Sequence, residues 1–409
     1  MSEDLNAQDS YDVAIVGGGP IGVTVGCALA QSGMKIIVLD KLSADTPVPD
    51  GRLVAIAHAS RNILKNIGVW PHVAEAAAPI DRIEIIDGHS TGHASYDHKL
   101  IGSDPMGYMV EMPKLRQALY RRSLELENFH WKAPCHIEKM DTDNFKSTLT
   151  LDDGSIVTAN LLVGADGRFS WVRDQMGVRV TKWKYTQKAI VCAVEHELPH
   201  KNIAYERFLP AGPFAILPNV SRDGKHLSSI VWAEDETKAD DYLALSEPKF
   251  SHEIQHRVGD QLGKITALGK RWSYPLGVHY VDRYIDQRTV LVGDSAHGVH
   301  PVAGQGLNMG FKDVAALVDV LVEGHQLGMD LGDKVLLEKY QRWRRFDNLM
   351  MIGAMDGLIK LFSNDYKSLK FLRRNGLRIV ERFPLAKKIF MKSAMGISGD
   401  VPSLIRNSG

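Results

Sequence analysis

A glycine-rich segment near the N-terminus has the spacing of a site for dinucleotide phosphates. It runs from Gly17 to Gly22, directly after an apolar segment that is typical of a buried parallel strand. Gly17 permits a tight turn, Gly19 lets the backbone approach a pyrophosphate, and Gly22 lets the next helix pack closely on the strand. Backbone N–H groups at the start of that helix, beside Pro20, attract an anion. The segment therefore predicts a βαβ unit that binds a dinucleotide.

An acidic residue closes the next expected strand, Lys35–Asp40, eighteen residues after Gly22. The Asp40 carboxylate can accept a hydrogen bond from an adenosine ribose hydroxyl, and it repels a 2′-phosphate. FAD or NAD therefore fits the unit better than NADP. Lys41, the next residue, is a neighbouring candidate for cofactor binding.

Two further carboxylates end apolar segments beside a glycine. We expect buried strands over Leu161–Asp166 and Thr289–Asp294. Carboxylates at the carboxyl ends of parallel strands lie at the edge where α/β proteins bind ligands. Taken alone, Asp166 is better explained as a strand end that precedes a helix capped by Ser170.

The loop after Asp294 is rich in glycine and proline and leads into a helix expected to start near Leu307. Asp294 can accept hydrogen bonds from ribityl or ribose hydroxyls. The N-terminus of the helix can stabilise negative charge on a bound ring system, as a reduced flavin requires. Such a long stretch of special backbone is hard to explain by packing alone.

Composition excludes several classes of protein. The chain has 409 residues, with 49 Lys and Arg against 49 Asp and Glu. A net charge of zero argues against nucleic-acid binding, which needs unpaired cations to neutralise phosphates. Three widely spaced cysteines, Cys27, Cys135 and Cys192, predict neither a disulfide framework nor a metal site. The N-terminus has no pattern of a secretory or transit signal, so we expect a cytoplasmic protein.

Several separated segments are expected to build an α/β fold of two domains and a tail. A Rossmann-like FAD-binding domain with a mainly parallel sheet would carry an inserted, mostly antiparallel β-sheet domain for the substrate. After Leu307 the chain is expected to be helical to its end, with breaks near Gly357, Gly376 and Pro384. The expected limits are 1–80, 111–180 and 281–357 for the FAD-binding domain, 81–110 and 181–280 for the substrate domain, and 358–409 for the helical C-terminal region.

The C-terminal region is basic, which the neutral total conceals. Between Asp356 and Gly409, eleven Lys and Arg stand against four acidic residues, so this region carries +7 and the remainder −7. Apolar residues intersperse with the cations, as in a helix that lies on an anionic membrane. A helix that packs on its own domain with a solvated basic face explains the pattern equally well. Peripheral contact with a bacterial inner membrane is therefore one of two open interpretations.

The three motifs together resemble those of the class A flavoprotein monooxygenases, which have the para-hydroxybenzoate hydroxylase-like fold. The resemblance is closest to the ubiquinone-biosynthesis hydroxylases and covers roughly residues 11–396. It assigns both Asp166 and Asp294 to the FAD site. The further segments that carry it are Asp50–Arg52, Tyr108–Leu119, Asn202–Pro218, Ile230–Trp232, Tyr274–Leu276 and His300–Asn308.

The resemblance also assigns residues outside the three motifs. Arg52 would lie near the flavin and its pyrophosphate, and Arg116 would reach the cofactor phosphates, with a solvated surface arginine as the alternative for each. Pro301 would lie at the substrate face of the flavin, and with Arg52 and His300 it is a candidate catalytic residue. His297 and His300 lie in the same loop, where packing explains a histidine at least as well as proton transfer does. The residues expected to contact the isoalloxazine ring are Gly304, Gln305, Gly306, Leu307 and Asn308.

The resemblance implies an enzyme that binds FAD, accepts electrons from transiently docked NAD(P)H and reacts with O2 to give a flavin C4a-hydroperoxide. This species would hydroxylate the ring of a polyprenylphenol intermediate of ubiquinone biosynthesis. Glu206 and Arg207 would either face that substrate or, in the safer interpretation, form a salt-bridged pair on their strand. Two alternatives remain open, a flavin-dependent reductase or dehydrogenase of an isoprenoid and a non-catalytic FAD-binding assembly subunit. Other quinone-biosynthesis enzymes are further candidate partners, and the oligomeric state is open.

Overall fold

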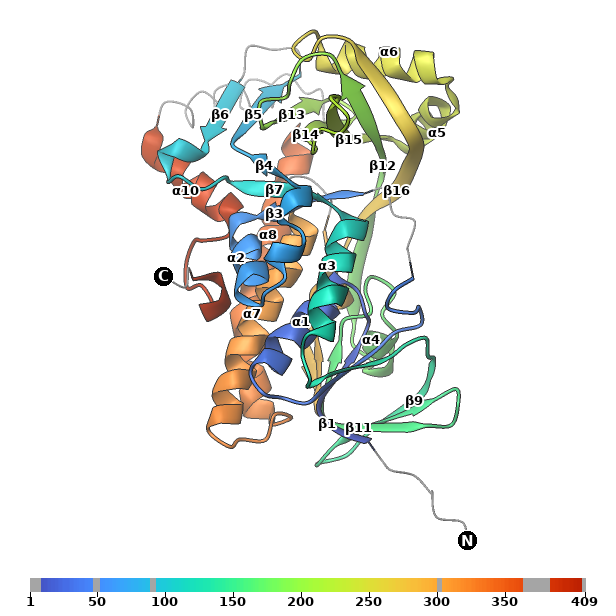
Figure 1. Cartoon of the computed structure of the whole chain (residues 1–409), viewed down its shortest axis with the longest axis vertical. Helices are drawn as coiled ribbons and strands as arrows, with labels where there is room; N and C mark the ends of the chain where they lie inside the picture. Colours follow the sequence, from blue (N-terminus) through green and yellow to red (C-terminus); the bar gives the residue numbers. More distant parts are fainter. Residues whose placement is uncertain (1–8, 47–51, 89–92, 300–303, 363–382, 407–409) are drawn as a thin grey trace.

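A mainly parallel sheet carries the glycine-rich segment. The computed structural model describes residues 9–46, 52–88, 93–299, 304–362 and 383–406. Strands β18, β11, β1, β2 and β8 are parallel neighbours in that order, while β17, β10 and β9 pair antiparallel at the margins (Figure 1). The strands are β1 (Asp9–Val16), β2 (Ile36–Leu39), β8 (Phe129–Lys132), β9 (Ile137–Thr142), β10 (Ser147–Leu151), β11 (Ile156–Gly164), β17 (Ile285–Asp286) and β18 (Thr289–Leu291).

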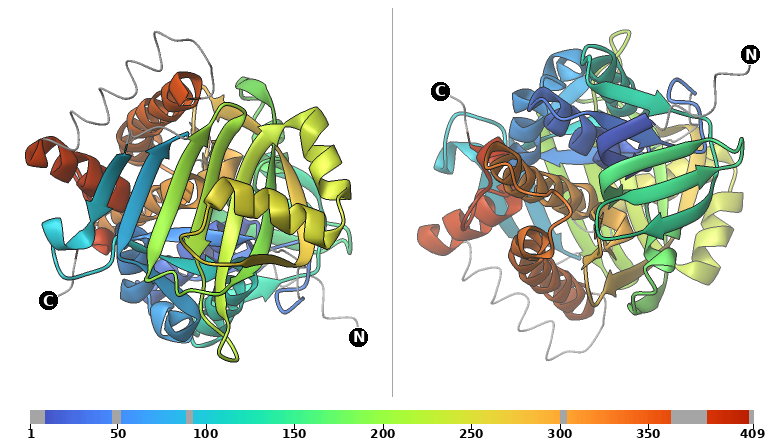
Figure 2. Two further views of the ribbon diagram at one scale, coloured as in Figure 1. Left: turned by 90° about the horizontal axis from the view of Figure 1, so that it is seen from above. Right: turned by 90° about the horizontal axis from the view of Figure 1, so that it is seen from below.

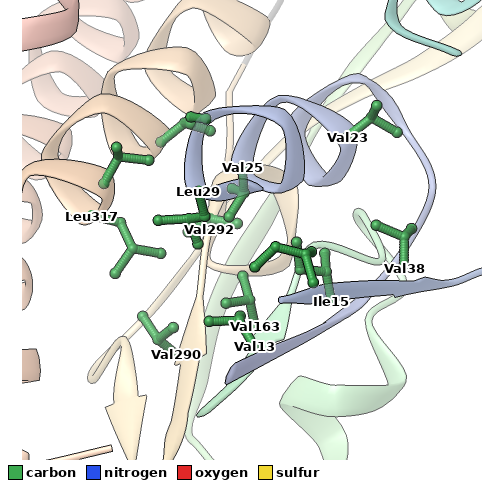
Figure 3. Close-up of a cluster of buried hydrophobic side chains, with 14 of the residues drawn as sticks. Val13, Ile15, Val23, Val25, Leu29, Val38, Val163, Val290, Val292 and Leu317 are labelled. Atoms are coloured by element: carbon green, nitrogen blue, oxygen red, sulfur yellow. The ribbon is translucent and has the colours of Figure 1, made fainter. Parts of the chain in front are cut away.

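The core of this part forms where the central strands meet two helices. Val13 and Ile15 of β1 and Val163 of β11 are fully buried, and Leu29 of α1 and Leu317 of α7 pack against them (Figure 3). The central strands are nearly continuous apolar runs because residues on both of their faces are buried. The helices of this part and of the C-terminal region are α1 (Pro20–Gln31), α2 (His58–Asn66), α3 (Met112–Leu124), α4 (Trp171–Gln175), α7 (Gln305–Gln326), α8 (Lys334–Phe362) and α10 (Pro384–Met395).

A second sheet is mostly antiparallel, and helices α5 (Glu236–Ala244) and α6 (Glu247–Val258) cover one of its faces (Figure 2, left). On that face Phe214 and Trp232 pack with Phe250 of α6. From one edge to the other, its strands are β19 (His297–Gly298), β16 (Ile265–Val281), β12 (Val180–His196), β15 (His226–Asp235), β14 (Gly212–Pro218), β13 (Ile203–Leu209), β5 (Arg82–Asp87) and β6 (His93–Asp97).

A small antiparallel sheet lies between the two larger ones (Figure 1). Its strands are β3 (Leu53–Ala57), β7 (Gly107–Glu111) and β4 (Ala77–Ile80), with β7 in the middle. The parallel sheet, the antiparallel sheet and the C-terminal helices follow the expected architecture. The domain limits given above remain a prediction.

The structure corrects three expectations about individual elements. The strand expected to reach Asp294 ends at Leu291, because Gly293 has a φ of 61° and turns the chain into a short 3-10 segment, η4 (Gly293–Ser295). Helix α8 continues through Gly357, because the burial of Ile359 offsets the roughly 1 kcal/mol that a glycine costs in a helix. The described chain after α10, residues 396–406, is not α-helical, although Ser403–Ile405 forms a 3-10 turn.

The described part of the C-terminal region packs on the rest of the protein. Met391 and Met395 of α10 contact a cluster around Met106, and Ile405 is buried. The side chain of Asn62 on α2 donates a hydrogen bond of 3.1 Å to the Ile405 carbonyl. The expected break near Gly376 and much of the basic apolar pattern lie outside the described residues. None of the described helices has an apolar stretch long enough to cross a bilayer.

Candidate active site

One large cavity lies where the start of α1, strand β3, the start of α7 and the second sheet converge. Its volume is about 1960 Å³. A site for one small ligand usually has about 300–1,000 Å³. Gly19 and Pro20 line it at one side, and Ala189 and Ala233 of the second sheet line it at another. The cavity therefore has room for a cofactor and a substrate together.

The glycine turn brings the N-terminus of α1 to this cavity. Gly17 has a φ of 114°, and a Cβ on Gly22 would lie only 2.0 Å from the Gly17 carbonyl oxygen, so both positions require glycine. A Cβ on Gly19 would meet nothing within 4 Å. Pro20 begins α1, where its missing N–H costs nothing. The open space beside Gly19 and the helix N-terminus suit a pyrophosphate.

Asp40 lies beside the glycine turn, as its position after β2 predicted. Its carboxylate accepts hydrogen bonds from the backbone N–H groups of Gly18, at 2.5 Å, and Leu42, at 2.7 Å. Each carboxylate oxygen has a second lone pair that can receive a ribose hydroxyl. Lys41 is exposed. Arg116 of α3 lines a small pocket with Gly18, which places its side chain near the turn.

Asp166 follows β11 and holds the start of α4. Its Oδ2 accepts a hydrogen bond of 3.1 Å from the Val172 N–H, and the Ser170 hydroxyl caps the helix by accepting from the Arg173 N–H. The other carboxylate oxygen, Oδ1, is buried without a hydrogen bond to any described residue. Burial raises the pKa of Asp166. An acceptor left over in this way fits a hydroxyl group of a bound cofactor.

Asp294 lies in η4, directly after β18, and its exposed side chain lines the cavity. The turn is fixed by its neighbours. The Ser295 hydroxyl donates to the Gly164 carbonyl at 2.6 Å, and His279 Nε2 lies 2.8 Å from the Asp294 carbonyl oxygen. Because β11 and β18 pair in parallel, Asp166 and Asp294 follow strands that end at the same edge of the sheet.

A buried polar network, which the sequence did not indicate, anchors this turn to α7 and α8. The Asp313 carboxylate accepts from the Gly293 N–H at 3.1 Å, from Arg344 Nε at 2.9 Å and from Asn348 Nδ2 at 2.9 Å, and it lies 2.5 Å from His297 Nε2. Burial alone would raise the pKa of Asp313, but His297 and Arg344 outweigh it and hold the pKa below its usual range. His297 thus contacts protein groups and holds the loop.

The N-terminus of α7 approaches strand β3. Gly304 is left-handed, and a Cβ there would lie 2.8 Å from the Ala55 Cβ. Asn308 is buried, and its amide oxygen accepts from the Ala57 N–H and the Ser60 hydroxyl. Its amide nitrogen donates to the carbonyls of Ala55 and Gly304, each at 2.8 Å. The Asn308 side chain therefore fixes the loop against β3, which the sequence did not indicate. Gln305, Gly306, Leu307 and Asn308 all line the cavity.

Arg52 directly precedes β3 and lines the same cavity. The centre of its guanidinium group lies 5.5 Å from the ring centroid of Tyr274 on β16, a cation–π distance. His300 and Pro301, the other two residues assigned to the reaction, lie outside the described residues.

Glu206 and Arg207 do not form the salt-bridged pair that was the safer interpretation of the sequence. They are neighbours on β13, so their side chains point to opposite faces of the second sheet. Glu206 lines the cavity, whereas Arg207 reaches the Val258 carbonyl of α6 at 3.5 Å. Burial raises the pKa of Glu206 to about 7.

The glycine turn, the unpaired oxygen of Asp166, the exposed Asp294 and the two helix N-termini fit the phosphates, hydroxyls and ring of FAD. They define the site of an FAD-dependent enzyme with the fold expected from the sequence. The model of the FAD binding domain family matches residues 10–346. A p-nitrophenol 4-monooxygenase of Pseudomonas putida has a similar fold, with a TM-score of 0.79 at 17% identity, over 96% of this chain and 99% of that chain.

Curated relatives narrow the class. The chain is 43% identical to ubiquinone hydroxylase UbiL of Rhodospirillum rubrum, over 98% of this chain and 94% of the relative. It is 33% identical to the 3-demethoxyubiquinol 3-hydroxylase of Escherichia coli, over 94% of this chain and 98% of the relative. The chain therefore belongs to the ubiquinone hydroxylase family of FAD-dependent aromatic-ring monooxygenases. FAD is its cofactor, with NAD(P)H and O2 as the co-substrates typical of the class.

Proposed function

We propose that this protein hydroxylates the aromatic ring of a polyprenylated phenol on the route to ubiquinone. One observation carries the proposal: a single apolar cavity extends from the cofactor residues to helices α8 and α10. The names of the two relatives support the same substrate class.

The far end of the cavity suits an isoprenoid chain. It is lined there by Leu358 and Leu361 of α8 and by Phe390, Met391 and Ala394 of α10. Burial of an apolar chain contributes roughly 25 cal/mol for each Å² removed from water. A phenol ring held near Gly304–Asn308 would thus leave its prenyl chain against these helices.

Different residues of the cofactor site would hold different parts of FAD. Gly19 and the α1 N-terminus would hold the pyrophosphate with Arg116 nearby, and Asp40 would hold the adenosine ribose. Asp166 and Asp294 would accept hydrogen bonds from the ribityl–pyrophosphate region. When bound, FAD supplies the electron transfer from NAD(P)H and the activation of O2. The N-terminus of α7, at Gln305, would stabilise negative charge on the flavin ring.

The remaining residues would shape the reaction space. Arg52, held over Tyr274, would keep a positive charge beside the flavin and its pyrophosphate. Pro301 would lie at the substrate face of the flavin, as the family resemblance implies, and His300 of the same loop is a candidate for proton transfer. The apolar walls of the cavity would exclude water from the reacting ring.

Deletion of the gene in its host tests the proposal. Mass spectrometry of the quinone pool should then reveal a polyprenylphenol that lacks one ring oxygen, and expression of the intact gene should remove it. An unchanged quinone pool in a host without a redundant hydroxylase would contradict the proposal. A precursor that has all its ring oxygens but keeps a double bond that the mature quinone lacks would instead favour a reductase.

We also propose that α10 touches the membrane from which such a substrate comes. Phe383 and Ile389 are exposed by 60% and 64%, and the exposed Lys388 and Lys392 flank Ile389. Removal of the whole tail would disturb the core contacts of Met391 and Met395, so point changes test the contact better. The F383S/I389S variant should bind vesicles containing anionic lipid more weakly than the wild type. F145S, at an exposed phenylalanine between β9 and β10, is the control, and equal binding by all three proteins would refute the contact.

A further inference from the structure

A row of residues across the cavity side of the second sheet is apolar except for a single carboxylate. In register across five neighbouring strands lie Ile85 of β5, Glu206 of β13, Ala215 of β14, Val231 of β15 and Val191 of β12. All five side chains line the cavity. The opposite face of the same strands packs on α5 and α6. Glu206 is therefore the charged member of a row that otherwise presents hydrocarbon to the substrate.

The Glu206 carboxylate has no hydrogen bond or ion pair with any described residue. A second glutamate of this sheet behaves differently: Glu84, on the opposite face, accepts from the Ser95 hydroxyl at 2.9 Å and contacts His93. Leaving a carboxylate unpaired in apolar surroundings costs free energy, so a group of this kind needs a role that offsets the cost. The space in front of it is open because its neighbours Ala204 and Ala215 are small.

No hydrogen bond or ion pair joins Glu206 to another ionisable residue of the described cavity lining, and Asp87 lies on the same face of β5 as Ile85. The other ionisable residues that line the cavity are Arg52, Tyr96, Arg168, Arg173, Asp174, Lys182, Lys184, Tyr205, Tyr274, His279 and Asp294. The strand β14 that pairs with β13 contributes none. The chemistry of the nearest substrate group will therefore decide what Glu206 does.

We propose that Glu206 accepts the hydrogen bond of the phenol hydroxyl and takes its proton as the ring is hydroxylated. The inference rests on the proposed function, because it requires a phenol in the cavity. The O–H bond of the phenol breaks, its electron pair stays on the phenol oxygen, and the proton forms a neutral carboxylic acid on Glu206. The negative charge moves from one oxygen to another without changing the net charge of the cavity. The proton returns to solvent when the product leaves.

Burial brings the pKa of Glu206 closer to that of the phenol from which it would take the proton. The pKa of Glu206 is raised to about 7, while a phenol hydroxyl of the tyrosine type titrates near 10. The mismatch is about 3 pKa units, compared with nearly 6 for an ordinary glutamate, and a smaller mismatch makes a more effective general base. The resulting phenolate is richer in electrons and more open to electrophilic attack than the phenol.

The test compares the wild-type holoenzyme with E206Q on a panel of 2-farnesylphenols with and without ring methoxy and methyl groups. In the wild type, kcat/KM should rise as the pH increases through about 7, because Glu206 must be ionised to accept the proton. In E206Q this rise with pH, the pH limb, should disappear. The kcat/KM of E206Q near pH 8 should be lower than that of the wild type by about 10²- to 10⁴-fold. The activity of E206Q should recover toward pH 10, where the phenol ionises unaided.

A second readout does not depend on turnover. Without NAD(P)H and O2, the phenol should bind the wild type at pH 8 several-fold more tightly than it binds E206Q, because a carboxylate accepts a stronger hydrogen bond than an amide does. Its O-methylated analogue has no proton to donate and should show no preference for the wild type. E84Q removes a glutamate from the opposite face of the same sheet and should keep both the pH limb and the wild-type affinity for the phenol. FAD absorbance reports whether each variant is folded.

An E206Q enzyme with the wild-type pH limb and an unchanged affinity for the phenol would overturn the inference while leaving the proposed function intact. Failure of the wild type to hydroxylate any phenol of the panel would instead count against the proposed function. In that case, an affinity for the phenol that depends on Glu206 would still support the inference, and an affinity that does not depend on Glu206 would overturn it.

Discussion

The cofactor site and the cavity-facing side of the second sheet are built in opposite ways. At the cofactor site, the backbone itself forms most of the surface that would bind FAD. It does so through glycines at 17, 19 and 22, a left-handed Gly304 and two helix N-termini. On the second sheet, side chains from five strands form the surface and the backbone contributes only their alternation. A cofactor shared by many proteins is bound by residues that are close together in the sequence. A particular substrate is bound by side chains from strands that are far apart in the sequence.

Two carboxylates that differ in their partners show the same difference. Asp313, behind the cofactor loop, has partners on every side, and they hold its pKa below the usual range. Glu206, in the substrate cavity, has none among the described residues, and burial raises its pKa to about 7. The first is a structural charge that should stay ionised, and the second is a group that can exchange a proton near neutral pH.

The largest effect should come from breaking the Asp313 network. D313N removes the buried carboxylate that pairs with Arg344 and leaves only the more exposed Asp347 as its charge partner, and loss of one member of a buried pair typically costs about 3–5 kcal/mol. Chemical denaturation of the holoenzyme should show this loss in the free energy of unfolding. D319N on the same helix, where the carboxylate accepts from the Ser403 N–H near the surface, should cost no more than about 1 kcal/mol. Equal losses in the two variants would remove the proposed role of the network.

A stability change of the opposite sign is expected for E206Q. The pKa of Glu206 lies above that of the unfolded chain, so the folded state binds a proton more readily and loses stability as the pH rises from about 4.5 to about 7. At pH 8, E206Q should therefore be more stable than the wild type by about 2–3 kcal/mol, and at pH 4 the two should be nearly equal. Denaturation at the two pH values measures this difference, and a gap that does not change with pH would contradict it.

Gly19→Ala separates cofactor binding from folding. A Cβ at this position meets no protein atom within 4 Å and the backbone is extended, so the free energy of unfolding of the apoprotein should change by less than about 0.5 kcal/mol. The dissociation constant for FAD, measured by fluorescence titration, should rise about tenfold or more because the methyl group occupies the space proposed for the pyrophosphate. Gly22→Ala is the contrast, since its Cβ clashes with the Gly17 carbonyl and should destabilise the fold itself. Unaltered FAD affinity in Gly19→Ala would move the phosphate site elsewhere.

The smallest effect should come from filling the substrate side of the cavity. Ala215 lies beside Glu206 in register, and A215L adds three carbon atoms to the space proposed for the ring. The KM for a farnesylphenol should rise several-fold to about tenfold, while the dissociation constant for FAD stays unchanged. A fall in FAD affinity with no change in KM would show that this part of the cavity holds the cofactor instead.

The sequence predicted best those features that depend on neighbouring residues. The turn at Gly17–Gly22, the acidic end of β2 and the Ser170 cap each depend on a few adjacent positions, and the structure has all three where they were expected. The early end of β18 was missed because a single glycine, Gly293, changes the backbone direction within an apolar run.

The features that the sequence did not predict depend on contacts between distant segments. Asn308 bonds to Ala55 and Ala57, about 250 residues earlier in the chain, and nothing in its local pattern indicates those partners. Asp313 and Arg344 meet only because α7 and α8 pack together. Glu206 and Arg207 resembled an ion pair because they are neighbours in the sequence, but successive side chains of a strand point to opposite faces of the sheet.

The most direct test of the proposed function is to follow oxygen into the product. Purified holoenzyme, NAD(P)H and a polyprenylphenol are incubated under ¹⁸O2, and the product is analysed by mass spectrometry. We predict one ¹⁸O atom on the aromatic ring for each NAD(P)H consumed in the coupled reaction. Consumption of NAD(P)H that yields only hydrogen peroxide, with every phenol of the panel recovered unchanged, would contradict the account.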